Sequence, residues 1–347
     1  LQQNPTLSLL LALEGAERLP GRLADAAVLA ALQELPGREQ ILEGHAQAVE
    51  AAVYDREGSR LATGAKDKTA RLWDLETGKE LRRFVGHGDS VTAVALSPDG
   101  RRLVTGSKDW TVGTWSTDTG NLEHALLGHQ AGIISVHVVL DGTRVLTAAD
   151  DRTIRLWHAE SGALLCTHTL PWVGFFESPI LLPDGVHALA RSGRGLQRLR
   201  LEDLAVQAEA TFEGTELLST VAVSPDGRWI AAGAVDWTLR LFDASSLAEV
   251  ARSSLGNQGA SKVLFSADGS TVAVTGGRMV RSWRLEVAED GTPSLGEDFA
   301  RKPLGDRAIT AGFRGQELIL RLANGGVERR RAPDLEIEGR VQVAGGG

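Results

Sequence analysis

Three sets of histidine, threonine and aspartate recur along the chain at identical spacing, and these residue types can do chemistry together. In each set a threonine lies 18 residues after the histidine, and an aspartate lies 22 residues after it. The sets are His45 with Thr63 and Asp67, His87 with Thr105 and Asp109, and His129 with Thr147 and Asp151. An imidazole held between a hydroxyl and a carboxylate is the proton relay of nucleophilic hydrolases.

The repetition itself argues against catalysis. An enzyme needs one such site, whereas this chain carries three copies that lie 42 residues apart. No copy adds a unique nucleophile with its own base, and the chain has no Gly-x-x-x-x-Gly-Lys-Ser/Thr loop for a phosphate. We therefore expect no catalytic residues and no cofactor.

Each set is part of a longer repeated motif. A glycine precedes each histidine, each aspartate opens an Asp-x-Thr turn, and a tryptophan lies 28 residues after the histidine, at Trp73, Trp115 and Trp157. A period in the low forties is typical of repeat architectures, in which each unit buries its apolar face against its neighbours.

These motifs resemble the WD-repeat family over roughly residues 38 to 343. The segments Leu72-Trp73-Asp74 and Arg155-Leu156-Trp157-His158 lie where that family has its Trp-Asp pair. The resemblance implies a β-propeller of four-stranded antiparallel blades around a channel. It also implies that the His, Thr, Asp and Trp of one blade form a buried hydrogen-bonded network, because buried polar groups need partners.

An acid–glycine pair marks the turn between the first two strands of the first six units and allows the later ones to be followed. Tight turns between antiparallel strands favour glycine because it adopts positive φ without strain. The pairs are Glu57-Gly58, Asp99-Gly100, Asp141-Gly142, Asp184-Gly185, Asp226-Gly227 and Asp268-Gly269.

Counting onward from these glycines identifies the later units. The fifth unit has Asp236 and Phe242 at the Asp and Trp positions, whereas in the fourth the counts reach Arg194 and Arg200, so that its polar network is lost. The sixth keeps Trp283 and has an insertion around 289–293, and a seventh is expected at 308–313, 317–323 and 326–331. We predict an all-β, seven-bladed WD-repeat β-propeller over residues 38–347.

The first 37 residues differ in kind. Asn4-Pro5 is a helix N-cap with proline at the first helical position, and Pro20-Gly21 and Pro36-Gly37 each end a Leu/Ala-rich run. We predict a short α-helical hairpin over residues 1–37. Its place before a propeller is similar to bacterial multidomain signalling proteins, STAND-type ATPases in particular. Because the chain begins at Leu1, we expect it to be part of a longer product.

Two segments compete for the outer strand of the last blade. Residues 39–42 directly precede the first Gly-His pair, and residues 335–343 follow the seventh unit. Pairing one terminus with the last blade removes an open sheet edge, and the sequence leaves both segments as candidates.

Composition excludes several classes of function. The net charge of -8 argues against a binder of nucleic-acid backbones, and no run approaches 18 apolar residues, so that no membrane span is expected. The single cysteine, Cys166, indicates a reducing compartment, and we expect a cytoplasmic protein. The histidines outside the three sets have no ligand spacing, so no metal site is expected.

The middle residue of the Asp-x-Thr turn is a candidate for partner binding. It is basic at Lys68 and Arg152, but it is aromatic at Trp110 and Trp237. In the resembled fold this turn lies on the face that propellers most often use for partners, and exposed tryptophan is favoured at binding hot spots. Trp172 is a further candidate, and packing against neighbouring loops is the alternative for all three tryptophans. Arg329-Arg330-Arg331 is expected to be solvated and to protect a sheet edge.

Two classes of function remain. We favour a non-enzymatic protein–protein interaction propeller, the sensor or scaffold module of a larger cytoplasmic signalling or defence protein. Its partner is either a separate protein or an upstream domain of the same polypeptide. The alternative is the propeller portion of an enzyme whose catalytic module, an ATPase, protease or kinase, lies upstream of residue 1. The sequence does not indicate an oligomeric state.

Overall fold

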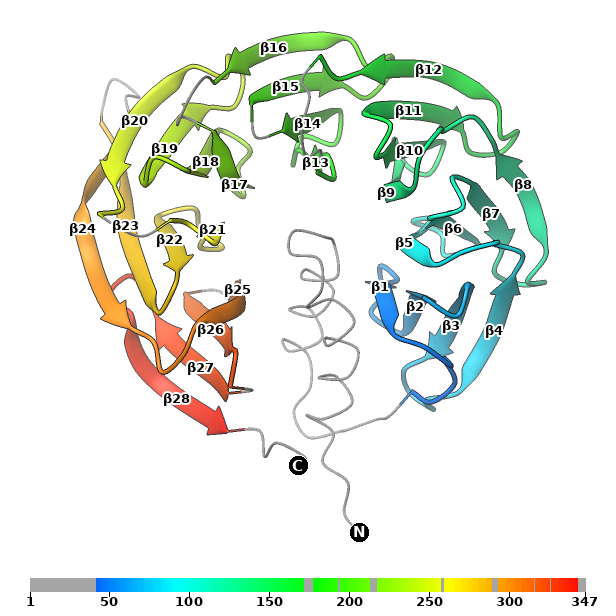
Figure 1. Cartoon of the computed structure of the whole chain (residues 1–347), viewed down its shortest axis with the longest axis horizontal. Helices are drawn as coiled ribbons and strands as arrows, with labels where there is room; N and C mark the ends of the chain where they lie inside the picture. The colour runs from blue at the N-terminus through cyan, green and yellow to red at the C-terminus, as the bar shows by residue number, and fades with distance from the viewer. Residues whose placement is uncertain are drawn as a thin grey trace. The chain divides into compact units, whose positions relative to one another are not determined.

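The computed structural model describes residues 42–171, 177–192, 194–212, 217–256, 259–288, 293–314, 316–324 and 326–342. These residues form strands β1 to β28, which pair into seven antiparallel sheets of four strands each (Figure 1). The sheets agree in number and strand count with the predicted seven-bladed propeller. The helical hairpin predicted for residues 1–37 lies outside the described residues.

Every sheet takes four consecutive strands in chain order. The first three sheets are β1 Val49–Tyr54, β2 Arg60–Ala65, β3 Thr69–Asp74 and β4 Glu80–Val85; β5 Val91–Leu96, β6 Arg102–Ser107, β7 Val112–Ser116 and β8 Leu122–Leu126; and β9 Ile133–Val139, β10 Arg144–Ala149, β11 Thr153–His158 and β12 Leu164–Thr169. The fourth and fifth are β13 Ile180–Leu181, β14 His187–Ser192, β15 Gly195–Arg200 and β16 Val206–Thr211; and β17 Leu218–Val223, β18 Trp229–Ala234, β19 Thr238–Asp243 and β20 Glu249–Ser254. The last two are β21 Lys262–Phe265, β22 Thr271–Gly276, β23 Met279–Val287 and β24 Pro293–Pro303; and β25 Ala308–Arg314, β26 Glu317–Leu322, β27 Gly326–Arg331 and β28 Glu336–Gln342.

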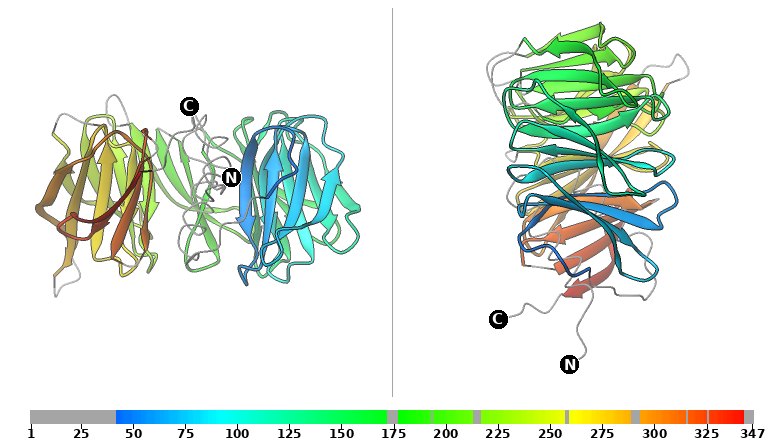
Figure 2. Two further views of the ribbon diagram at one scale, coloured as in Figure 1. Left: turned by 90° about the horizontal axis from the view of Figure 1, so that it is seen from below. Right: turned by 90° about the vertical axis from the view of Figure 1, so that its right-hand side faces the viewer.

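The described residues divide into two compact units. The first holds β1 to β12 with residues 177–179 and Arg200–Ala205, and the second holds the other described residues. Within the first unit β1 packs against β5, and β5 packs against β9. Figure 2 shows the strands of these three sheets, coloured from blue to green.

Glycines on the second strand let neighbouring sheets of the first unit approach closely. A Cβ on Gly64 would lie 2.6 Å from Cγ1 of Val91 and 3.0 Å from Cγ1 of Val94. A Cβ on Gly106 would lie 3.0 Å from the Cβ of Ile133. These clashes would cost packing energy, so glycine is required where the first sheet meets the second and where the second meets the third.

The turns between first and second strands confirm the role assigned to the acid–glycine pairs. All six glycines adopt positive φ, between 66° and 90°, which is the left-handed region open to glycine. They are Gly58, Gly100, Gly142, Gly185, Gly227 and Gly269.

A register shift near the start of the innermost strand marks several sheets, and the residue at the shift links one sheet to the next. In the second sheet this residue is Thr92, whose hydroxyl donates to the Ile133 carbonyl at 2.6 Å. In the fifth it is Ser219, whose hydroxyl donates to the Ala260 carbonyl at 3.1 Å. In the first sheet the same position holds Glu50, a carboxylate where Thr92 and Ser219 have a hydroxyl donor.

The fourth sheet corrects one equivalence drawn from counting. In the first sheet Trp73 lies at the register shift opposite Glu80, and the corresponding residue in the fourth sheet is Leu199, opposite Val206. Arg200 therefore does not occupy the tryptophan position. The count fails because the turn after β14 is one residue shorter than in the first three sheets. Leu199 is fully buried and keeps the packing without the polar contacts.

The last sheet corrects the expectation for the three arginines. β27 lies between β26 and β28, so it is not an edge strand. Arg329 and Arg331 are exposed, but Arg330 is 2% exposed and occupies the tryptophan position, opposite Ile337 at the register shift. Its guanidinium donates to Glu328 Oε2 at 2.7 Å and to the Leu335 carbonyl at 3.1 Å. Alternation along the strand predicts that the three arginines point to different faces of the sheet. It does not predict the buried ion pair of Arg330 with Glu328.

The outer strand of the last sheet is β28, so the 335–343 segment takes that place. Of the competing segment, residues 39–41 lie outside the described residues, and Leu42 is not in a strand.

Candidate functional site

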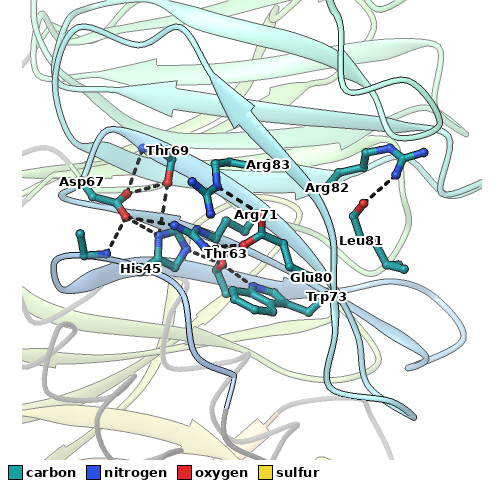
Figure 3. Close-up of polar contacts among 11 residues, drawn as sticks. His45, Thr63, Asp67, Thr69, Arg71, Trp73, Glu80, Leu81, Arg82 and Arg83 are labelled. Carbon is teal, nitrogen blue, oxygen red and sulfur yellow. Dashed lines mark hydrogen bonds and ion pairs between the residues drawn. The ribbon is translucent and has the colours of Figure 1, made fainter.

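The first His–Thr–Asp–Trp set is assembled by the loop before β1, strand β2, the β2–β3 turn and strand β3 (Figure 3). The Trp73 indole donates to Thr63 Oγ1 at 2.8 Å, and Thr63 Oγ1 lies 2.8 Å from His45 Nε2. His45 Nδ1 lies 2.9 Å from Asp67 Oδ2. The four side chains therefore form one continuous hydrogen-bonded chain.

The chemistry of these groups fixes the direction of the protons. An indole N–H can only donate, so Thr63 accepts from Trp73 and gives its own proton to His45 Nε2. The remaining imidazole proton is then on Nδ1, where it is donated to the Asp67 carboxylate. Asp67 also accepts from the backbone N–H of Ala46 at 2.9 Å and from the Thr69 hydroxyl at 2.7 Å. Every polar group of the set has a partner, with His45 in its neutral form.

The second and third sets repeat this geometry. His87 lies 2.7 Å from Thr105 Oγ1 and 3.2 Å from Asp109 Oδ2, and Trp115 donates to Thr105 at 2.8 Å. The corresponding distances in the third set are 2.8 Å for His129 to Thr147, 3.0 Å for His129 to Asp151 and 2.9 Å for Trp157 to Thr147.

Burial sets the electrostatics of the network. It lowers the pKa of His45, His87 and His129 below the ordinary value of 6.5, against the opposing pull of the aspartates. Burial by itself raises the pKa of Asp67, but hydrogen bonds from Thr69, His45 and Ala46 outweigh it and hold that pKa at about 2. The stable form is thus a neutral imidazole beside an ionised carboxylate.

The same geometry leaves the hydroxyl a poor nucleophile. Thr63 is 6% exposed, and Thr105 and Thr147 are fully buried. Each threonine oxygen already accepts from a tryptophan that is at most 4% exposed. A substrate carbonyl must reach the hydroxyl in order to be attacked, so this arrangement favours a structural role for all three sets.

The fifth sheet uses a different partner for its aspartate. Asp236 accepts from the Thr238 hydroxyl at 2.5 Å and pairs with the guanidinium of Arg240, which is 1% exposed. Burial raises the pKa of Asp236, but the bonds from Thr238 and Arg240 outweigh it and lower that pKa. An arginine thus stabilises the turn without a histidine.

The Asp-x-Thr turns place four sequence-predicted partner residues in an unusual backbone conformation. Lys68, Trp110, Arg152 and Trp237 have positive φ of 69°, 72°, 64° and 63°. Bulky side chains seldom adopt this region, and the conformation costs about 1 kcal/mol or more. Sequence reasoning missed it, because glycine or asparagine is the usual signal for such a position.

The two tryptophans remain open to solvent despite this cost. Trp110 is 53% exposed and Trp237 is 49% exposed, each in its own unit. Lys68 and Arg152 are exposed as well. About half of each tryptophan is therefore open to a partner, while the other half packs locally. Trp172 lies outside the described residues.

Comparisons with known proteins bear on the fold. The family model described as "WD domain, G-beta repeat" matches residues 37–74, 78–116, 120–158 and 207–243. These four segments match WD repeats. The matches cover the three complete sets and strands β17 to β19 of the fifth sheet, where Asp236 and Phe242 stand in the motif.

Solved structures agree at low sequence identity. One is the computationally designed Ika8 protein, with a TM-score of 0.67, 21% identity and coverage of 87% of this chain and 89% of that chain. Another is the Cps50 (Swd1) β-propeller domain of Myceliophteria thermophila, with a TM-score of 0.56, 18% identity and coverage of 81% and 95%. No curated protein matches the chain. The repeats and these neighbours support a WD-repeat β-propeller.

Two features are absent from the described residues. No helix among them is long and apolar enough to span a membrane. Nor do they contain a group of three or more His, Cys, Asp or Glu side chains arranged to hold a metal ion.

Proposed function

We propose that this WD-repeat chain is a non-enzymatic protein–protein interaction module, the sensor or scaffold part of a larger cytoplasmic signalling or defence protein. WD-repeat propellers generally mediate protein–protein interaction. The observation that carries the proposal is the exposed Trp110, held at positive φ at the tip of a turn whose other residues are hydrogen-bonded.

The network beneath the turn prepares Trp110 for binding. Asp109 accepts from the Thr111 backbone N–H at 2.9 Å, from the Thr111 hydroxyl at 2.6 Å and from the Gly88 N–H at 2.6 Å. These bonds fix the backbone on both sides of the indole. A side chain presented by a rigid turn loses little entropy on binding, so more of its contact energy appears as affinity.

Site-specific photo-crosslinking in the source cells tests the proposal. A photoreactive phenylalanine analogue at position 110 is expected to capture a defined protein, and the same analogue at Arg101 is the control. Arg101 is exposed on the loop between β5 and β6, at the opposite end of β6 from the Trp110 turn. The proposal fails if position 110 captures nothing, or if both positions capture the same proteins.

Removing either exposed indole is expected to weaken partner binding without unfolding the protein. Trp110→Ala and Trp237→Ala should each cost about 2 kcal/mol of binding, which is roughly a thirtyfold rise in Kd. The free energy of unfolding should stay within about 1 kcal/mol of the parent, because both rings are half exposed. Titration of the crosslinked partner beside urea unfolding measures both. A large stability loss at unchanged Kd would show that the rings only pack locally.

The purified chain is expected to show no intrinsic hydrolysis of ATP, peptides or esters, because the three threonine hydroxyls are buried and already hydrogen-bonded. Turnover assays with Thr63→Val, Thr105→Val and Thr147→Val as comparisons check this. Activity that co-purifies with the parent and is lost in one of these variants would contradict the structural assignment.

A further inference from the structure

Glu50 lies at the register shift near the start of β1, where Thr92 and Ser219 use a hydroxyl to reach the next sheet. A β-bulge re-aims a side chain, and here it directs a carboxylate toward the second sheet. The Glu50 side chain is 8% exposed, and its Oε2 is buried without a hydrogen-bond partner. A carboxylate in this position needs cations nearby, because an isolated buried charge is costly.

Two lysines supply these cations from adjacent sheets. Glu50 Oε1 lies 3.7 Å from Nζ of Lys66 in the β2–β3 turn and 3.8 Å from Nζ of Lys108 in the β6–β7 turn. The two turns therefore lie next to each other on one face of the first unit. The lysine side chains remain 32% and 43% exposed. Two ammonium groups share one buried carboxylate, so these three side chains together carry one net positive charge.

The residues at the tips of these turns are also exposed. Lys68, Trp110 and Arg152 occupy equivalent tips on three consecutive sheets, and all three are exposed. The β10–β11 turn, which carries Arg152, lies beside the β6–β7 turn near Gly132. A Cβ on Gly132 would lie 3.6 Å from the Lys108 Cα and 3.7 Å from Asp150 Oδ2. A basic, an aromatic and a basic side chain thus form a row along the tips of three neighbouring turns.

The aspartates that open these turns are hydrogen-bonded within them. Asp67, Asp109 and Asp151 are taken up by hydrogen bonds to backbone N–H, threonine and histidine groups. Asp89 and Asp150 are the exposed acids beside the row, against the exposed cations Lys68, Lys108 and Arg152 and the half-exposed Lys66. Cations therefore outnumber acids among the exposed side chains of these turns, although the three hydrogen-bonded aspartates stay ionised and the whole chain carries -8.

We infer that the partner docks on this face through an acidic segment that carries an apolar side chain. The apolar side chain packs on Trp110, carboxylates on either side pair with Lys68 and Arg152, and a further carboxylate neutralises the Lys66–Lys108 pair. Charge complementarity of this kind fixes the register of a bound segment and speeds encounter. The inference rests on the proposed interaction function, and it names the chemical class of the partner.

Fluorescence anisotropy of the full chain with a labelled peptide, Glu-Glu-Leu-Glu-Glu, tests the inference. We expect binding at low salt that weakens as salt is raised, and about a tenfold or larger loss of affinity in the Lys66→Glu, Lys108→Glu double variant. Arg101→Glu is a control charge reversal at the other end of β6, and it should change the affinity less than about twofold. The inference is wrong if no binding is detected at millimolar peptide, or if the control weakens binding as much as the double variant.

Three further ligands separate the acidic segment from other occupants. Gln-Gln-Leu-Gln-Gln should not bind, and equal affinity for it would show that charge plays no part. Tighter binding of a single-stranded DNA oligonucleotide, or of Glu-Glu-Leu-Glu-Glu with a phosphoserine in place of the leucine, would assign the face to a polyanion or a phosphopeptide instead.

The crosslinked partner distinguishes this inference from the function on which it rests. If Trp110→Ala weakens that partner but the double variant does not, the partner is not acidic and the interaction function stands. If neither variant weakens it, both proposals fail.

Discussion

Asp109→Ala is expected to lower the free energy of unfolding by roughly 1–3 kcal/mol, because several partly buried donors lose their acceptor. Asp109 accepts from His87, from the hydroxyl and N–H of Thr111, and from the Gly88 N–H. Its loss leaves Thr111 Oγ1, at 3.0 Å, as the remaining partner of His87 Nδ1, while His87 stays bonded on its other side to Thr105. Urea unfolding followed by tryptophan fluorescence measures the change.

Asp118→Ala is the matched control for this loss. Asp118 is exposed in the turn between β7 and β8 of the same sheet, and its carboxylate makes no hydrogen bond among the described residues. Its replacement should change stability by less than about 0.5 kcal/mol. Equal stability of the Asp109→Ala variant and the parent would refute a structural role for the second set.

Acidification below pH 6.5 is expected to destabilise the protein steeply. Burial lowers the pKa of His45, His87, His129 and His137, and that of His137 falls to about 4. The unfolded chain therefore binds more protons than the folded chain below pH 6.5. The stability that the neutral histidines provide is complete above that pH and is lost as the pH falls toward each folded pKa. Each histidine contributes a slope of at most about 1.4 kcal/mol per pH unit.

The aspartates add a second, lower window with the same sign. Asp67 has a pKa of about 2 in the folded chain against an ordinary value of 3.8, so its contribution is lost only as the pH falls between these values.

His137→Ala separates one histidine from the rest. His137 lies on β9 with its Nε2 3.3 Å from Ser178 Oγ, and Ala95 occupies the equivalent position on β5. The variant should fold and lose stability less steeply between pH 7.5 and 5 than the parent. Unfolding free energies that are flat across this range in the parent would contradict neutral buried histidines.

The elements that sequence reasoning could predict are those fixed by local chemistry at constant spacing. Gly58 and Gly100 signal their turns because few other residues adopt their backbone, and alternating apolar residues between such turns specify strands. Counting failed where spacing changed. The turn after β14 is one residue shorter, so Leu199 and not Arg200 occupies the tryptophan position.

The parts of the candidate surface that could not be predicted depend on contacts between sheets or on backbone strain. No local pattern brings Glu50 to Lys108, since they lie on different sheets and meet only through packing. Positive φ at Trp110 is imposed by the hydrogen bonds of Asp109, and indole carries no preference for it. Arg330 occupies the position that tryptophan holds in the first three sheets, and it forms a buried ion pair with Glu328. The alternation of residues along a strand does not predict such a pair.

Asp109 and Trp110 are adjacent in the chain but are assigned opposite roles, so their paired measurement tests the account most directly. The free energy of unfolding and the Kd for the crosslinked partner are determined for Asp109→Ala and Trp110→Ala. We predict that Asp109→Ala loses roughly 1–3 kcal/mol of stability, and that Trp110→Ala keeps its stability while its Kd rises about thirtyfold. A stability loss in Trp110→Ala as large as that in Asp109→Ala, with an unchanged Kd, would contradict the account.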